Sequence, residues 1–126
     1  MNVSAMSMRH YLPAIAHYSA MKIALAHFTK NLAKTCKNDN IRANAVMPGW
    51  IASEQVERIL EREMETTGLD RHAVFLKHNE ENLEHCTFAD RIGEPVEYAD
   101  VIAFLVSDRA SYLNGGWVNV DGGSNF

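Results

Sequence analysis

The chain has 126 residues, 47% of them hydrophobic and 22% charged, and its formal net charge is −4 at pH 7. This length suits one small domain, and the composition is that of an ordinary globular protein. A negative net charge argues against binding to nucleic acid or to an anionic membrane surface. The apolar runs, such as VIAFLV, are too short to cross a bilayer, so we expect no membrane segment.

The N-terminal stretch MNVSAMSMRHYL has no basic region followed by an apolar one, and so predicts no signal peptide. The two cysteines, Cys36 and Cys86, are too few for a disulfide framework. Reduced thiols and a cytoplasmic location are therefore the expectation.

Several potential metal ligands gather in one stretch of the chain: His72, His78, His85 and Cys86. Their spacing matches neither a helical i, i+4 pair nor a C-x-x-C pair, so we expect no metal site. A solvated or substrate-lining role fits these side chains better.

In chain order, the sequence first predicts a short strand over residues 1–4, a loop, and a helix from about Ala14 to Cys36. Residues 41–48 alternate in polarity and predict a short buried strand that Pro48 ends. Ser53 can cap a helix over residues 53–66, and Asp70 can cap the first of one or two short helices that follow.

The last third of the chain predicts a helix that begins near Pro95 and ends at about Ser107. Its apolar stripe, Val101, Phe104 and Leu105, is expected in the core. A turn over residues 114–116 and a strand over residues 117–120 follow. Strands separated by helices favour parallel crossovers, but about three parallel strands make a poor sheet on their own. The sequence therefore predicts part of a larger α/β domain.

The stretch HYSAMKIAL, residues 17–25, places Tyr18 and Lys22 four residues apart in the predicted helix. Residues at this spacing share one helix face. An ammonium group there favours the charged phenolate, which would let the tyrosine exchange a proton. The alternative is an exposed pair that contributes only about a few tenths of a kcal/mol to stability.

Four segments, in this order, resemble the C-terminal half of a short-chain dehydrogenase/reductase: YSAMK (18–22), IRANAVMPGWIAS (41–53), RIGEPVEYADVIAFLVSDRASYLNG (91–115) and WVNVDGG (117–123). The resemblance implies a doubly wound parallel-sheet Rossmann fold. Residues 1–126 would form its C-terminal part, without the N-terminal dinucleotide-binding strands. Residues 54–90 match least, and correspond to the variable substrate-binding segment of the family.

The resemblance also implies an NAD(P)-dependent oxidoreductase that moves a hydride between nicotinamide and a carbonyl or secondary alcohol. Tyr18 would be the general acid/base, and Lys22 would lower its pKa and hold the nicotinamide ribose. Other residues would contact the cofactor: Pro48, Gly49, Ile51 and Ser53. NAD and NADP are not distinguished, because the residues that bind the 2′-position lie in the half of the family fold that the match does not cover.

The chain departs from the family pattern in three places. Nothing in it resembles the glycine-rich turn that binds the diphosphate, since NGGWVNVDGG flanks the last strand and opens no helix. The asparagine of the preceding family helix is also missing. The family serine stands about thirteen residues before the tyrosine, where this chain has Ala5. Ser4 is one residue away and Ser7 two. A one-residue shift would let Ser4 take the place of the family serine, which polarises the substrate carbonyl; otherwise that serine is lost.

Three functions remain open at this point. The first is the oxidoreductase, acting on a small carbonyl or alcohol substrate that the sequence does not identify. The second is a non-catalytic binding or oligomerisation module that pairs with a full-length relative through the helix after Tyr18. The third is half of a split enzyme whose glycine-rich half is a separate chain. The resemblance also implies a homo-oligomer. Binding of a dinucleotide distinguishes the enzyme from the bare module.

Overall fold

The computed structural model describes residues 1–9, 13–81 and 87–124. Its elements are β1 (Asn2–Val3), the 3₁₀ helices η1 (Met6–Arg9) and η2 (Pro13–Ile15), α1 (Ala16–Thr35), β2 (Ala45–Pro48), α2 (Glu54–Thr67), α3 (Arg71–Glu81), α4 (Pro95–Val106), the 3₁₀ helix η4 (Asp108–Ala110) and β3 (Trp117–Val120). The predicted helices and strands are confirmed, although the strand predicted over 41–48 is shorter. The predicted loop after the first strand instead contains η1 and η2.

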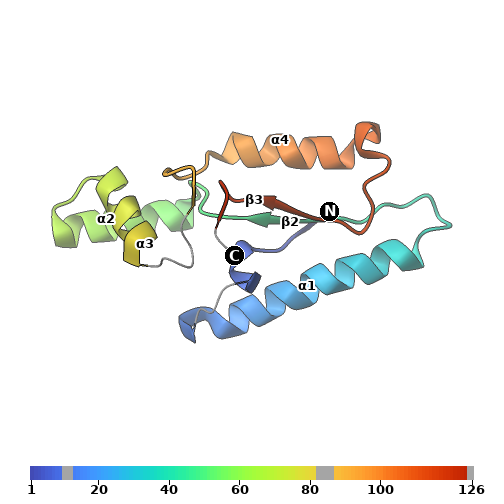
Figure 1. The fold of residues 1–126 in the computed structure, drawn as a ribbon, viewed down its shortest axis with the longest axis horizontal. Helices are drawn as coiled ribbons and strands as arrows, with labels where there is room; N and C mark the ends of the chain where they lie inside the picture. The colour runs from blue at the N-terminus through green and yellow to red at the C-terminus, as the bar shows by residue number, and fades with distance from the viewer. Residues whose placement is uncertain (10–12, 82–86, 125–126) are drawn as a thin grey trace.

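The three strands form one parallel sheet in the order β1-β2-β3. Asn2 pairs with Ala45, and Ala45 pairs on its other side with Trp117. Helix α1 lies on one side of this sheet and α4 on the other (Figure 1). Ala45, Val46 and Met47 are fully buried, as expected for a central parallel strand covered on both faces. The α/β architecture and the parallel crossovers are therefore confirmed.

Helices α2 and α3 lie beyond the end of β2 and pack on each other (Figure 1). Ser53 caps α2, since its Oγ accepts a hydrogen bond from the Val56 backbone N–H at 3.3 Å. Asp70 caps α3 in the same way, with its Oδ1 2.9 Å from the Ala73 nitrogen. Both predicted caps are confirmed. A small apolar core joins the two helices to the segment before α4: Leu60, Val74, Phe75 and Ile92.

The Arg42 side chain joins the start of the β2 segment to the end of α4. Its Nη1 donates to the backbone oxygens of Leu105 (3.0 Å), Ala110 (2.9 Å) and Leu113 (3.2 Å). Its Nη2 donates to the Ser107 oxygen at 2.9 Å. One guanidinium group thus satisfies the Leu105 carbonyl in the last turn of α4 and joins that turn to the segment that follows it.

Only part of the predicted apolar stripe of α4 enters the core. Leu105 is 2% exposed, whereas Phe104 is 41% exposed and lies with its ring centroid 5.8 Å from the Arg109 guanidinium carbon. The prediction for Phe104 was wrong because α4 carries apolar residues on nearly all sides, so periodicity does not select its buried face. Of the helices that the structure describes, none combines the length and hydrophobicity needed to cross a membrane.

An ion pair at the start of α4 predicts acid sensitivity. Arg91 donates two hydrogen bonds to the Glu97 carboxylate, at 2.8 and 2.6 Å, and the Glu94 backbone N–H donates a third at 2.8 Å. The Arg91 hydrogen bonds, followed by that of the Glu94 N–H, lower the pKa of Glu97 from 4.5 to about 2. A lowered pKa gives stability that is present above pH 4.5 and lost as the pH falls through about 2.

We therefore expect Glu97→Gln to melt at a lower temperature than the unaltered chain at pH 7, and the difference to vanish as the pH falls from 4.5 toward 2. Melting curves followed by circular dichroism across this range measure it. Glu61→Gln, which removes an exposed carboxylate of α2, is the control. A difference that stays constant down to pH 2 would contradict the assigned ion pair.

Candidate active site

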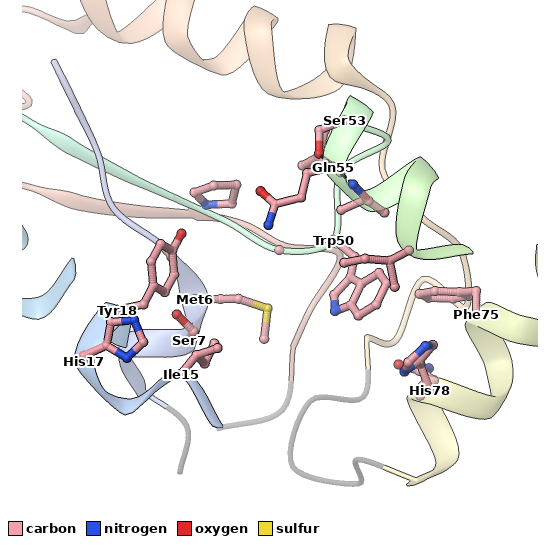
Figure 2. Close-up of a pocket in the computed structure, with 17 residues that line it drawn as sticks. Met6, Ser7, Ile15, His17, Tyr18, Trp50, Ser53, Gln55, Phe75 and His78 are labelled. Carbon is pink, nitrogen blue, oxygen red and sulfur yellow. Dashed lines mark hydrogen bonds between the residues drawn. The ribbon is translucent and has the colours of Figure 1, made fainter. Parts of the chain in front are cut away.

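A cavity of about 610 Å³ opens beside the carboxyl ends of the strands. Its walls come from η1, the start of α1, the turn after β2, and helices α2 and α3 (Figure 2). This edge is where α/β sheets bind their ligands, because the loops that follow parallel strands meet there. The cavity is therefore the candidate site.

The predicted pair of Tyr18 and Lys22 comes together at this edge. Tyr18 is in the first turn of α1, lines the cavity and is 42% exposed. Lys22 follows one turn later, with its Nζ 5.3 Å from the centroid of the Tyr18 ring. The same Nζ donates to the Val3 backbone oxygen at 2.9 Å, which fixes the ammonium against β1. The ammonium and the phenol thus lie on one face of α1, one helical turn apart.

The structure does not bring Ser4 into the cavity. Its side chain is 1% exposed, and its Oγ donates to the Lys22 backbone oxygen at 2.7 Å. The hydroxyl therefore points from the end of β1 toward α1, where it holds the helix to the sheet. Ala5 and Ser7 line the cavity instead.

The residues predicted to contact the cofactor all line the same cavity: Pro48, Gly49, Ile51 and Ser53. Gly49 follows the last residue of β2 and lies against the end of β3. A Cβ atom at Gly49 would be 2.8 Å from the Cα and Cβ atoms of Asp121, so a side chain there would require the backbone to move. The turn thus depends on glycine for this close approach. Ile51 next forms a parallel bridge with Gly93, which fixes the start of the segment before α2.

The opposite wall contains Trp50 and Phe75, which the sequence did not single out, and His78, which was considered above. Trp50 lies edge-on to Phe75, with their ring centroids 6.3 Å apart, and 5.2 Å from the ring of His78 (Figure 2). His78 lines the cavity, as the substrate-lining alternative expected, and its Nε2 is 2.8 Å from Glu63 Oε1. These residues come from separate segments, so no local spacing could have grouped them. For Trp50, the only sequence signal of a place in the cavity was its position directly after Pro48 and Gly49.

The charge of the cavity wall is low. Among its described lining residues there is no lysine, arginine, aspartate or glutamate, and His17 and His78 are the only basic side chains. His17 lies in the first turn of α1, within the helix that the sequence predicts from about Ala14. In the described part of the chain, no group of three or more His, Cys, Asp or Glu side chains could hold a metal ion. His85 and Cys86, considered as ligands above, lie outside the described residues.

The chain is similar in sequence to known reductases over almost its whole length. A family model described as enoyl-(acyl carrier protein) reductase matches residues 1–125. A 3-oxoacyl-[acyl-carrier-protein] reductase of Thermotoga maritima is 35% identical over 122 residues, which cover 97% of this chain and 43% of that protein. An acetoacetyl-CoA reductase of Shinella zoogloeoides is 31% identical over 125 residues, covering 99% of this chain and 46% of that protein.

Solved structures give the same result. L-sorbose reductase from Gluconobacter frateurii, in complex with NADPH and L-sorbose, matches with a TM-score of 0.86 and 30% identity over 97% of this chain and 45% of that protein. YwfH, an NADPH-dependent reductase of bacilysin biosynthesis, matches with a TM-score of 0.81 and 26% identity over 98% of this chain and 45% of that protein. The chain thus spans less than half the length of these relatives, and it belongs to the short-chain dehydrogenase/reductase family of oxidoreductases.

Proposed function

We propose that the chain is part of an NAD(P)-dependent oxidoreductase that acts on a small carbonyl compound or secondary alcohol. It would supply the residue that transfers the proton and the residues that bind the nicotinamide. The observation that carries this proposal is the cavity that Tyr18 shares with Pro48, Gly49, Ile51 and Ser53. It combines a potential proton donor with an apolar wall and with the turn after β2.

In this proposal, Tyr18 exchanges the proton. During reduction its phenol donates a proton to the substrate oxygen, and during oxidation its phenolate removes one. Lys22 acts on Tyr18 through its charge, because its Nζ lies 5.3 Å from the ring centroid and is fixed by the Val3 oxygen. The charge favours the phenolate that remains after the proton has left.

The residues present fit the nicotinamide end of a dinucleotide. A Cβ at Gly49 would collide with Asp121, so glycine lets the chain turn here, and both Gly49 and Tyr18 line the cavity. Ser53 and Ile51 would hold the nicotinamide carboxamide, and Lys22 the ribose. When bound, the reduced cofactor supplies the hydride that adds to the carbonyl carbon. NAD and NADP both remain candidates, since the residues proposed here do not reach the 2′-position.

A thermal melt of the 126-residue chain tests this proposal. A ligand that binds only the folded state raises the melting temperature by mass action. Because the proposed contacts are all at the nicotinamide end, we expect a rise with NADH or NADPH, and a rise with reduced nicotinamide mononucleotide alone. Adenosine monophosphate, which lacks the nicotinamide, is the matched control. An equal rise with adenosine monophosphate, or no rise with any of these, would contradict the proposed site.

One observation favours the second candidate, a binding or oligomerisation module without catalysis. On one face of α1, the apolar side chains of Met21 and Phe28, seven residues apart, are 71% and 56% exposed. Such a face could pair with another copy or with a full-length relative. A module of this kind would associate in solution without any response to nicotinamide.

A separate glycine-rich chain would be required only for the split enzyme, and mixing the two halves would then restore turnover. The cytoplasmic location stays a prediction.

A further inference from the structure

The cavity contains a buried hydroxyl that the proposed function has not used. Ser7, in η1, lines the cavity and is 7% exposed. Its Oγ has no hydrogen-bond partner in the part of the chain that the structure describes. A buried polar atom without a partner destabilises a fold, so its presence in a ligand cavity requires an explanation. Figure 2 shows Ser7 and Tyr18 on the same side of the cavity, across from Trp50 and Phe75.

The other residues near this position do not offer a buried hydroxyl without a partner to the cavity. Ser4 is 1% exposed, its Oγ donates to the Lys22 oxygen at 2.7 Å, and it does not line the cavity. Ala5 lines the cavity but offers only a methyl group. Ser53 lines the cavity too, but it is exposed, so its hydroxyl is not a buried group without a partner, and its Oγ accepts the hydrogen bond that caps α2. Ser7 alone in this group combines a place in the cavity with a hydroxyl that has no partner.

We propose that Ser7 donates a hydrogen bond to the substrate oxygen that Tyr18 protonates, in place of the serine that the family pattern puts at Ala5. This inference rests on the proposed function. Ser7 keeps its own proton throughout, and the proton that the oxygen gains comes from Tyr18. The hydrogen bond from Ser7 strengthens as negative charge develops on the oxygen, so it stabilises the transition state more than the bound ketone.

If Ser7 contacts the substrate, Ser7→Ala should weaken ligand binding without lowering the melting temperature. A purely structural role would lower the melting temperature instead. Ser7→Ala removes an unsatisfied buried hydroxyl, so its melting temperature without ligand should be unchanged or higher. Ser19→Ala is the matched control, because the Ser19 Oγ is also buried without a partner but does not line the cavity. Both variants should therefore fold equally well, and only Ser7→Ala should affect ligands.

The first experiment measures binding of cyclohexanone, a small uncharged ketone, from the rise in melting temperature of the 126-residue chain. We expect binding about three- to tenfold weaker in Ser7→Ala, as for the loss of one hydrogen bond between uncharged groups. Ser19→Ala should bind as the unaltered chain does. Ala5→Ser combined with Ser7→Ala returns a hydroxyl to the same cavity and should recover part of the loss. Equal cyclohexanone binding by the chain and Ser7→Ala, or none by the unaltered chain, would overturn the inference.

The second experiment measures reduction of cyclohexanone, ethyl acetoacetate and benzaldehyde with NADH and NADPH. We expect kcat to fall about 10²- to 10³-fold in Ser7→Ala, the range for loss of one donor to a developing oxyanion, with a smaller change in KM. If kcat is the same in Ser7→Ala as in the unaltered chain, the role of Ser7 is overturned, and the proposed function is not. Absence of turnover in the unaltered chain, despite ketone binding, overturns the proposed function and with it this catalytic role.

Discussion

Replacing Tyr18 with phenylalanine is expected to lower kcat for carbonyl reduction by about 10²- to 10⁴-fold, the usual contribution of a positioned general acid. The ring stays in place beside Lys22, so the substitution removes only the hydroxyl that would donate the proton. KM should change little, because the lost interaction acts in the transition state rather than in the bound substrate. Steady-state oxidation of NADPH with ethyl acetoacetate measures both parameters.

Tyr112→Phe is the matched control for this substitution. Tyr112 is fully exposed and lies outside the cavity, so the loss of its hydroxyl should leave kcat and the melting temperature unchanged. Equal kcat values for Tyr18→Phe and the unaltered chain would show that another group donates the proton. A large fall in the melting temperature of Tyr18→Phe would instead point to a structural role for the hydroxyl.

The second large effect is expected from Arg42→Met, which should lower the free energy of unfolding by about 1–3 kcal/mol. The guanidinium is the donor to the Leu105 oxygen, and methionine fills similar space without any donor. The oxygens of Ser107, Ala110 and Leu113 keep hydrogen bonds from Ala110 N, Leu113 N and Asn44 Nδ2. Leu105 is buried, and a buried acceptor left without a partner costs about 1–3 kcal/mol. Urea unfolding followed by circular dichroism measures the change in the free energy of unfolding.

Arg58→Met controls for the loss of an arginine. Arg58 pairs with Glu54 on the surface of α2, with the two side chains 71% and 80% exposed, so its removal should cost less than about 1 kcal/mol. The loss of unfolding free energy in Arg42→Lys should lie between those of Arg42→Met and Arg58→Met. An ammonium keeps the charge but cannot reach all the oxygens from one position. A midpoint for Arg42→Met within experimental error of the unaltered chain would contradict the assigned role.

The sequence predicts best those parts of the site that depend on local spacing. Tyr18 and Lys22 lie on one helix face wherever α1 goes, and the turn at Pro48 and Gly49 ends a strand whatever packs against it. The caps at Ser53 and Asp70 also depend only on the next three residues, and both are observed.

The parts that could not be predicted depend on contacts between distant segments. Trp50, Phe75 and His78 meet only because α2 and α3 fold back onto the turn after β2. The directions of Ser4 and Ser7 follow from the short strand β1 and the 3₁₀ helix η1, neither of which has a periodicity long enough to recognise in the sequence. The spacing before Tyr18 therefore suggested Ser4, whereas in the described structure Ser7 lines the cavity and Ser4 does not.

The parallel sheet has a consequence for the order in which the chain folds. Both ladders join distant segments, Asn2 with Ala45 and Ala45 with Trp117, and the hydrogen bond from the Ala43 nitrogen to Asn114 Oδ1 spans 71 residues. No hairpin in the described sheet could nucleate it locally, so long loops must close before a ladder stabilises them. Helices α1 and α4 can form early from local contacts, whereas the cavity beside Tyr18 can exist only after the slow step has brought the three strands together.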